Sequence, residues 1–187
     1  MGLEIERKFL VPLQFQPMFV GRDGGVRQVQ AYLSDDPART VRVRLTQSGR
    51  STTATMTVKG KPRNGGMSKP EWEWDMPPAL VEDMIQELNP PFLDKTRYVI
   101  TYDGAEWEVD VLKVISEPAR ASTQWLYLVT AEVEMPSLEA ARRVTLPPWV
   151  GREVTGDKRY AMSMLTAEAA RYSAWRDAYV QGAHRGG

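Results

Sequence analysis

The sequence predicts an α+β protein in which an antiparallel barrel of eight strands is surrounded by helices. Two observations support this fold class. Charged and apolar residues alternate with a period of two through most of the 187 residues, which is the pattern of strands with one polar and one apolar face. With two further strands that are expected beside the six alternating segments, the total is about eight, which is enough to close a barrel with a usable interior. The length fits one domain with a sizeable core.

Six strands are predicted directly from the alternation. The first is 4–11, where Arg7 interrupts the pattern, and the others are 41–45, 54–59, 71–76, 106–111 and 131–135. Two further strands are expected at 28–33 and 95–103. The second of these leads into its neighbour through Asp103-Gly104, a typical hairpin turn.

Three helices are expected between and after these strands. Residues 79–88 have apolar residues at helical spacing and end at Asn89-Pro90-Pro91. Residues 137–143 begin with Ser137 as the N-cap. The longest helix is expected from Asp157 to about residue 180. Residues 12–25 are ambiguous, and residues 60–70, rich in Gly, Pro and Lys, are expected to form a loop.

The composition excludes several classes of function. The 24 Lys and Arg residues balance 24 Asp and Glu residues, which argues against a general nucleic-acid binder. The chain has no Cys, and its one His is His184 near the end, so Cys-ligated metal sites, thiol nucleophiles and His-based triads are excluded. No apolar run is long enough for a membrane span and no signal peptide is recognisable, so we expect a soluble cytoplasmic protein.

Like charges recur two residues apart on the predicted strands. Acidic pairs occur at 4/6, 71/73, 73/75, 106/108, 108/110 and 132/134, and basic pairs at 42/44 and 95/97. Any single pair is explained by a solvated strand face. Faces of one sign repel, however, and need something that neutralises them. In a closed barrel they would line a cavity of both signs, in which carboxylates bind Mg²⁺ or Mn²⁺ and cations bind phosphate.

The first strand contains Glu4-Ile5-Glu6-Arg7-Lys8, which resembles the Glu-x-Glu-x-Lys signature of the CYTH family, the triphosphate tunnel metalloenzymes. Further matching segments follow in family order at 30–33, 42–44, 57–60, 71–73, 95–98, 107–111, 131–134, 151–155 and 157–160. The resemblance is strongest to short bacterial members with one catalytic domain. It implies a tunnel domain over residues 1–182, a closed antiparallel barrel with helices outside, and a disordered tail over 183–187.

The resemblance also implies a function. We expect hydrolysis of inorganic tripolyphosphate to pyrophosphate and phosphate, with Mg²⁺ or Mn²⁺ as cofactor and a metal-activated water as nucleophile. Alternatives are an adenylate cyclase, a thiamine or nucleoside triphosphatase, and a non-catalytic polyphosphate-binding module. The expected partner is a polyphosphate or nucleotide, with no nucleic acid and no membrane, and a homodimer is possible.

The family's site residues transfer to matching positions. Phosphate would be bound by Lys8, Arg42, Arg44, Lys59, Lys95 and Arg97, with Lys158 or Arg159 reaching in from the last helix. Metal would be held by Glu4, Glu6, Glu71, Glu73, Glu108, Asp110, Glu132 and Glu134. The residues expected to act in catalysis are Glu4, Glu6, Lys8, Lys95 and Glu134.

Three features depart from the family pattern. Ala31 replaces a glycine, Met162 stands where many relatives have Asn, and residues 112–126 replace a short turn. Trp72, Trp74 and Trp107 alternate away from the charged faces and are expected in the core rather than as a platform for a base.

Overall fold

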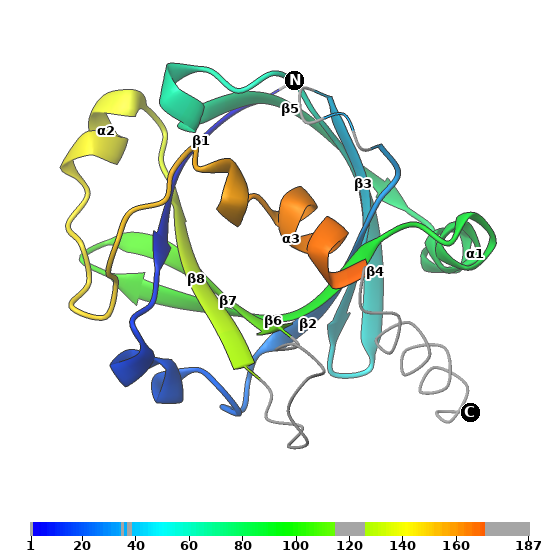
Figure 1. Ribbon diagram of the computed structural model, residues 1–187, viewed down its shortest axis with the longest axis horizontal. Coiled ribbons are helices and arrows are strands. Elements are labelled where there is room, and N and C mark those ends of the chain that lie inside the picture. Colours follow the sequence, from blue (N-terminus) through cyan, green and yellow to red (C-terminus); the bar gives the residue numbers. More distant parts are fainter. Residues whose placement is uncertain (1, 35, 37–38, 115–125, 171–187) are drawn as a thin grey trace.

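The computed structural model describes residues 2–34, 36, 39–114 and 126–170. Its centre is a closed antiparallel barrel in which the strands follow one another in the order β1-β5-β4-β3-β2-β6-β7-β8 (Figure 1). The strands are β1 (Gly2–Leu10), β2 (Val26–Tyr32), β3 (Thr40–Ser48), β4 (Ser51–Lys59), β5 (Ser68–Met76), β6 (Phe92–Tyr102), β7 (Ala105–Val114) and β8 (Leu126–Glu134). All eight predicted strands and the predicted fold class are therefore confirmed.

Strand β1 closes the barrel because it pairs with a different neighbour along each half of its length. Its first half, Gly2 to Ile5, pairs with β5, and its second half, Glu6 to Leu10, pairs with β8. The opposite wall is continuous, with β3 paired along its length to β4 and to β2. The alternation then places one face of every strand toward the interior.

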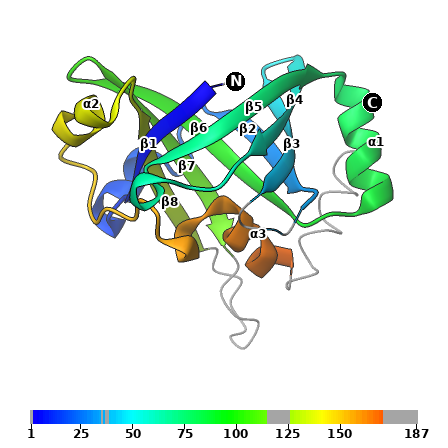
Figure 2. The same cartoon turned by 90° about the horizontal axis from the view of Figure 1, so that it is seen from above.

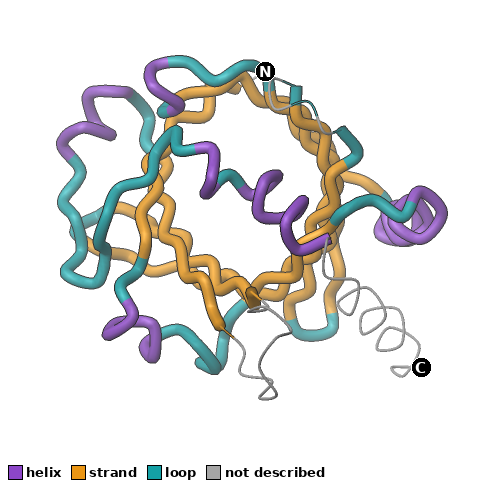
Figure 3. The backbone as a smooth tube through the Cα atoms, in the orientation of Figure 1, coloured by secondary structure: helices purple, strands orange, loops and turns teal. Residues whose placement is uncertain are grey.

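The helices lie outside this ring or across one of its ends. They are the α-helices α1 (Pro78–Leu88), α2 (Leu138–Arg143) and α3 (Met162–Ala170), and the 3-10 helices η1 (Leu13–Met18), η2 (Asn64–Gly66) and η3 (Lys158–Tyr160). Helix α1 packs against the outside of β3 and β4. Helix α3 crosses one end of the ring of strands (Figures 2 and 3) and contacts β6 and β2.

Two apolar clusters cover the outer faces of the strands, which explains why the core of this protein lies outside its barrel. One gathers Phe9, Trp107 and Val109 with Phe19 and Trp149 from the surrounding segments. The other joins residues of β2, β3 and β4 to Val81 and Ile85 of α1. Because the apolar faces are buried outward, the charged faces point inward.

Three expectations are corrected by the structure. The expected helix from Asp157 is broken at Ala161, whose extended backbone (φ −66°, ψ 133°) separates η3 from α3, and residues 171–180 lie outside the described residues. The loop expected over 60–70 ends earlier, because β5 begins at Ser68. Trp107 is buried as expected, but Trp74 is 52% exposed and is not a core residue.

Some expectations concern segments at or beyond the limits of the described residues. The departing segment 112–126 is strand at both ends, since β7 continues to Val114 and β8 begins at Leu126, while 115–125 lie outside the described residues. His184 and the expected tail over 183–187 also lie outside the described residues. In the part of the chain that the structure describes, no helix has the length and apolar character to cross a membrane.

Candidate active site

The charged strand faces meet inside the barrel. Ion pairs join strands that are separated by one strand in the sheet, so these side chains share a face and reach past the strand between them. Lys59 of β4 lies 2.6 Å from Glu4 of β1, and Arg97 of β6 lies 3.6 Å from Glu132 of β8. The interior therefore gathers the sequence-predicted residues Lys8, Arg42, Arg44, Lys59, Lys95, Arg97, Glu4, Glu6, Glu71, Glu73, Glu108, Asp110, Glu132 and Glu134.

The most deeply buried charges form a cluster of Lys95, Arg97 and Asp110. The Lys95 side chain is 1% exposed and that of Asp110 is fully buried, with 2.6 Å between Nζ and Oδ2. Arg97 donates to both carboxylate oxygens of Asp110 at 2.7 Å and also pairs with Glu108. Such bidentate, charge-assisted bonds fix the guanidinium plane.

Burial and charge act in opposite directions on these pKa values. Burial alone would raise the pKa of Asp110, but Lys95 and Arg97 outweigh it and lower the pKa to about 2. Burial lowers the pKa of Lys95 to about 8, despite the attraction of Asp110. Burial also opposes the charge of Arg97, yet Asp110 and Glu108 hold its pKa above the usual value. Asp110 is thus the ionised centre that keeps both cations in place.

A second cluster brings the first strand into contact with β8. Lys8 Nζ lies 2.9 Å from Glu132, and Glu132 also faces Arg97. Burial favours the neutral form of Glu132, but Lys8 and Arg97 outweigh it and hold its pKa well below the ordinary value. Two cations from different strands are therefore held by one carboxylate.

Lys69 joins the site although the sequence reasoning missed it. Its Nζ lies 2.6 Å from Glu6 and 3.9 Å from Glu4, so β5 contributes a cation that pairs with the carboxylates of β1. Burial opposes its charge, but Glu6 and Glu4 raise its pKa. The signal was present, since Lys69 shares the parity of Glu71 and Glu73. Pro70 hid it, because proline argues against a strand interior.

Arg42 and Arg44 occupy neighbouring inward positions of β3 but differ in their partners. Arg42 donates to Gln30 at 3.0 Å and lies 3.8 Å from Glu71. Within the described residues, Arg44 has no carboxylate within 4.0 Å, and its buried Nε, like that of Arg42, lacks an acceptor. Burial, together with Arg42 and Arg97, lowers the pKa of Arg44 to about 10.

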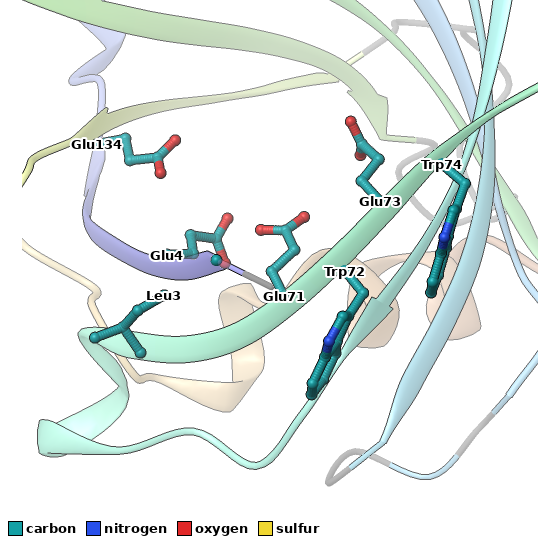
Figure 4. A pocket seen from close by; sticks show the side chains of 8 residues that line it. Leu3, Glu4, Glu71, Trp72, Glu73, Trp74 and Glu134 are labelled. Atoms are coloured by element: carbon teal, nitrogen blue, oxygen red, sulfur yellow. The ribbon is translucent and has the colours of Figure 1, made fainter.

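The acidic end of the interior opens into a pocket of about 320 Å³. Figure 4 shows Glu4, Glu71, Glu73 and Glu134 on one side of the strands, with Leu3, Trp72 and Trp74 pointing the other way. Burial and the charges of Glu4 and Glu71 raise the pKa of Glu134. In the described part of the chain no three acidic side chains are already grouped closely enough to hold a metal ion.

The two candidates before the last helix lie apart from these clusters. Arg159 is 74% exposed and pairs with Asp157 at 2.6 Å. Lys158 is exposed as well. Both residues belong to the 3-10 helix η3 rather than to α3. Among the described residues, neither Lys158 nor Arg159 has a carboxylate of the strand clusters within 4.0 Å.

Comparison with known proteins identifies the family. The model of the CYTH domain matches residues 2–172. The inorganic triphosphatase of Acetivibrio thermocellus is 34% identical over 166 residues, covering 88% of this chain and 94% of the relative. The inorganic triphosphatase of Nitrosomonas europaea is 35% identical over 166 residues, covering 87% and 95%. A crystal structure of an inorganic triphosphatase superposes with a TM-score of 0.54 at 30% identity, covering 89% of this chain and 95% of that one. The chain belongs to the CYTH family.

Proposed function

We propose that this protein hydrolyses inorganic triphosphate to pyrophosphate and phosphate inside the barrel, with Mg²⁺ or Mn²⁺ as cofactor. Two relatives that match nearly the whole chain are named inorganic triphosphatase. Their names give the substrate class, and the interior of this chain offers the cations and carboxylates that such a substrate and its metal require.

The observation that carries the proposal is that Arg44 has no carboxylate partner among the described residues. A guanidinium that faces Arg42 and Arg97 and has a buried Nε without an acceptor among the described residues is costly in free energy. An anion that enters between these side chains removes that cost. Triphosphate suits the position because its oxygens can accept from several guanidinium groups at once.

The carboxylates at the open end fit a divalent metal that arrives with the substrate. Glu134 has no cationic partner within 4.0 Å in the described residues and lies among like charges. Mg²⁺ commonly uses one or two carboxylates together with substrate phosphates rather than a complete protein cage, which agrees with the lack of a preformed group of three ligands in the part of the chain that the structure describes. Glu134, Glu4 and Glu71 would hold the ion, which supplies Lewis-acid chemistry to the phosphate when bound.

The chain's own residues would bind the substrate and stabilise the developing charge. Water attacks the terminal phosphorus, the bond to the bridging oxygen breaks, and pyrophosphate leaves. Arg44 and Arg42 would bind phosphate oxygens, and Arg97 is held in position by Asp110. Such fixed cations stabilise the charge that spreads over the transferring group.

The decisive experiment measures phosphate release from tripolyphosphate, pyrophosphate, ATP and thiamine triphosphate with Mg²⁺ or Mn²⁺. We expect preferential cleavage of tripolyphosphate and no turnover in excess chelator. Cyclic AMP from ATP would indicate a cyclase, and tight binding without cleavage would indicate a binding module. Either result would replace the proposal.

Two pairs of variants test the residues. Arg44→Met should raise KM for tripolyphosphate about 10- to 100-fold, because a hydrogen bond to a charged group is lost. The control Arg143→Met removes an arginine that is 79% exposed on α2 and should leave the rate unchanged. Glu134→Gln should abolish turnover, whereas Glu139→Gln, outside the barrel, should not. Equal effects within a pair would contradict the assignment.

A further inference from the structure

A short chain of hydrogen bonds runs along the inner face of β2. Nη1 of Arg42 donates to Oε1 of Gln30 at 3.0 Å, and Nε2 of Gln30 donates to the hydroxyl oxygen of Tyr32 at 2.6 Å. Gln30 is completely buried and Tyr32 is 8% exposed. Both bonds lie within the charged interior, because Gln30 and Tyr32 pair with Arg44 and Arg42 of β3.

The direction of this chain follows from chemistry. A guanidinium can only donate, so the end of the Gln30 amide that faces Arg42 must be its carbonyl oxygen. The other end is then the NH₂ group, which also can only donate, so the hydroxyl oxygen of Tyr32 must accept. Arg42 also contributes a side-chain hydrogen bond to Tyr32 and can only donate, so the proton of Tyr32 is not used in any hydrogen bond found for it among the described residues.

The surroundings of Tyr32 favour an anionic acceptor for that proton. Burial raises the pKa of Tyr32, although Arg42, Lys8 and Arg44 act in the opposite direction, so the phenol keeps its proton at neutral pH. The charges of the same three cations act on the hydroxyl and would attract phosphate to it. A buried hydroxyl proton without an acceptor is unfavourable until such an oxygen arrives.

We propose that Gln30 is a positioning residue that fixes the hydroxyl of Tyr32 as a hydrogen-bond donor to a phosphate oxygen of the substrate. This inference rests on the proposed function and adds two residues, Gln30 and Tyr32, to the site. Gln30 acts through Tyr32 and through its hold on Arg42 and does not itself touch the substrate.

A double-mutant cycle tests the proposal with tripolyphosphate and Mg²⁺. Tyr32→Phe should raise KM about 10- to 100-fold. It should change kcat little, because the phosphate oxygens are charged in the ground state and in the transition state. Gln30→Glu still accepts from Arg42, but its carboxylate also accepts from Tyr32 and reverses that bond. It should raise KM to a similar extent in the wild type and much less in the Tyr32→Phe background.

Two further variants provide a substitute for Gln30→Glu and a control. If the buried carboxylate of Gln30→Glu prevents folding, Gln30→Met can replace it, because methionine is neutral and close in size. Its effect on KM should likewise shrink in the Tyr32→Phe background. Gln28→Met is the matched control, because Gln28 lies on the same face of β2 and its Oε1 has no hydrogen-bond partner among the described residues. Its effect should simply add to that of Tyr32→Phe.

The outcomes separate this inference from the function on which it rests. Failure of the wild type to cleave tripolyphosphate would refute the proposed function. With an active wild type, equal KM effects of the Gln30 variants in both backgrounds, or a loss in kcat with unchanged KM, would refute the role of Gln30. A smaller amount of correctly folded enzyme lowers kcat and leaves KM unchanged, so a merely structural role cannot produce the expected result.

Discussion

Replacement of Asp110 by asparagine tests whether the buried charges hold the barrel together as well as shape its interior. Asp110 is fully buried and binds Lys95 and Arg97 at 2.6 and 2.7 Å. Removal of one partner from a buried ion pair typically costs about 3–5 kcal/mol, since it leaves an uncompensated charge. Asp110→Asn leaves two such cations, so we expect a loss at the upper end of that range.

The pKa of Asp110 gives an independent estimate of part of this loss. A shift from 3.8 to about 2 stabilises the folded state by about 2 kcal/mol at neutral pH. Because the folded-state pKa is lowered, this contribution is complete above about pH 4 and is lost as the pH falls toward 2. The destabilisation caused by Asp110→Asn should therefore shrink on acidification across this window.

The assay is urea unfolding of the wild type, Asp110→Asn and the control Glu108→Gln. Glu108 lies two residues away on the same strand face and also pairs with Arg97, but its side chain is 43% exposed. A pair of this exposure is worth about 0–1 kcal/mol. Equal losses for the two variants, or a loss that grows toward pH 2, would refute the reasoning.

Three further predictions concern other parts of the barrel. Lys69→Met frees the Glu6 carboxylate, so calorimetry without triphosphate should show Mn²⁺ binding about tenfold tighter, and weaker binding would contradict the role given to Lys69. Glu134→Gln should stabilise the metal-free protein at pH 7.5, because the folded-state pKa of Glu134 is raised, and this gain should disappear in thermal melts below about pH 4. Gly156→Ala places a Cβ 2.0 Å from the backbone oxygen of Gly65, whereas a Cβ at Gly104 meets open space at a similar φ. Gly156→Ala should therefore lower the free energy of unfolding by about 1–3 kcal/mol more than Gly104→Ala. Similar melting temperatures of the two variants would argue against this contact.

The alternation of residues determined which side of each strand faces the interior. Glu4, Glu6 and Lys8, for example, share one face of β1 because side chains alternate with a period of two. This local rule was sufficient to predict six of the eight strands and, with the family resemblance, the charged interior, whereas 28–33 and 95–103 were predicted without a clear alternation of charge. It failed where local signals conflicted, since Pro70 concealed the start of β5, and with it Lys69.

The tertiary structure decided which of these charges are paired and how deeply each is buried. Lys59 and Glu4 are 55 residues apart and meet only because β1 closes the ring against β5 and β8. Asp110 is buried and Glu108 is half exposed on the same face, because they lie at different depths along the barrel. Arg42 reaches Gln30 and Glu71, whereas Arg44, two residues further along β3, has no carboxylate partner among the described residues. Periodicity is a property of neighbours along the chain, whereas pairing and burial depend on which strands stand opposite one another after closure.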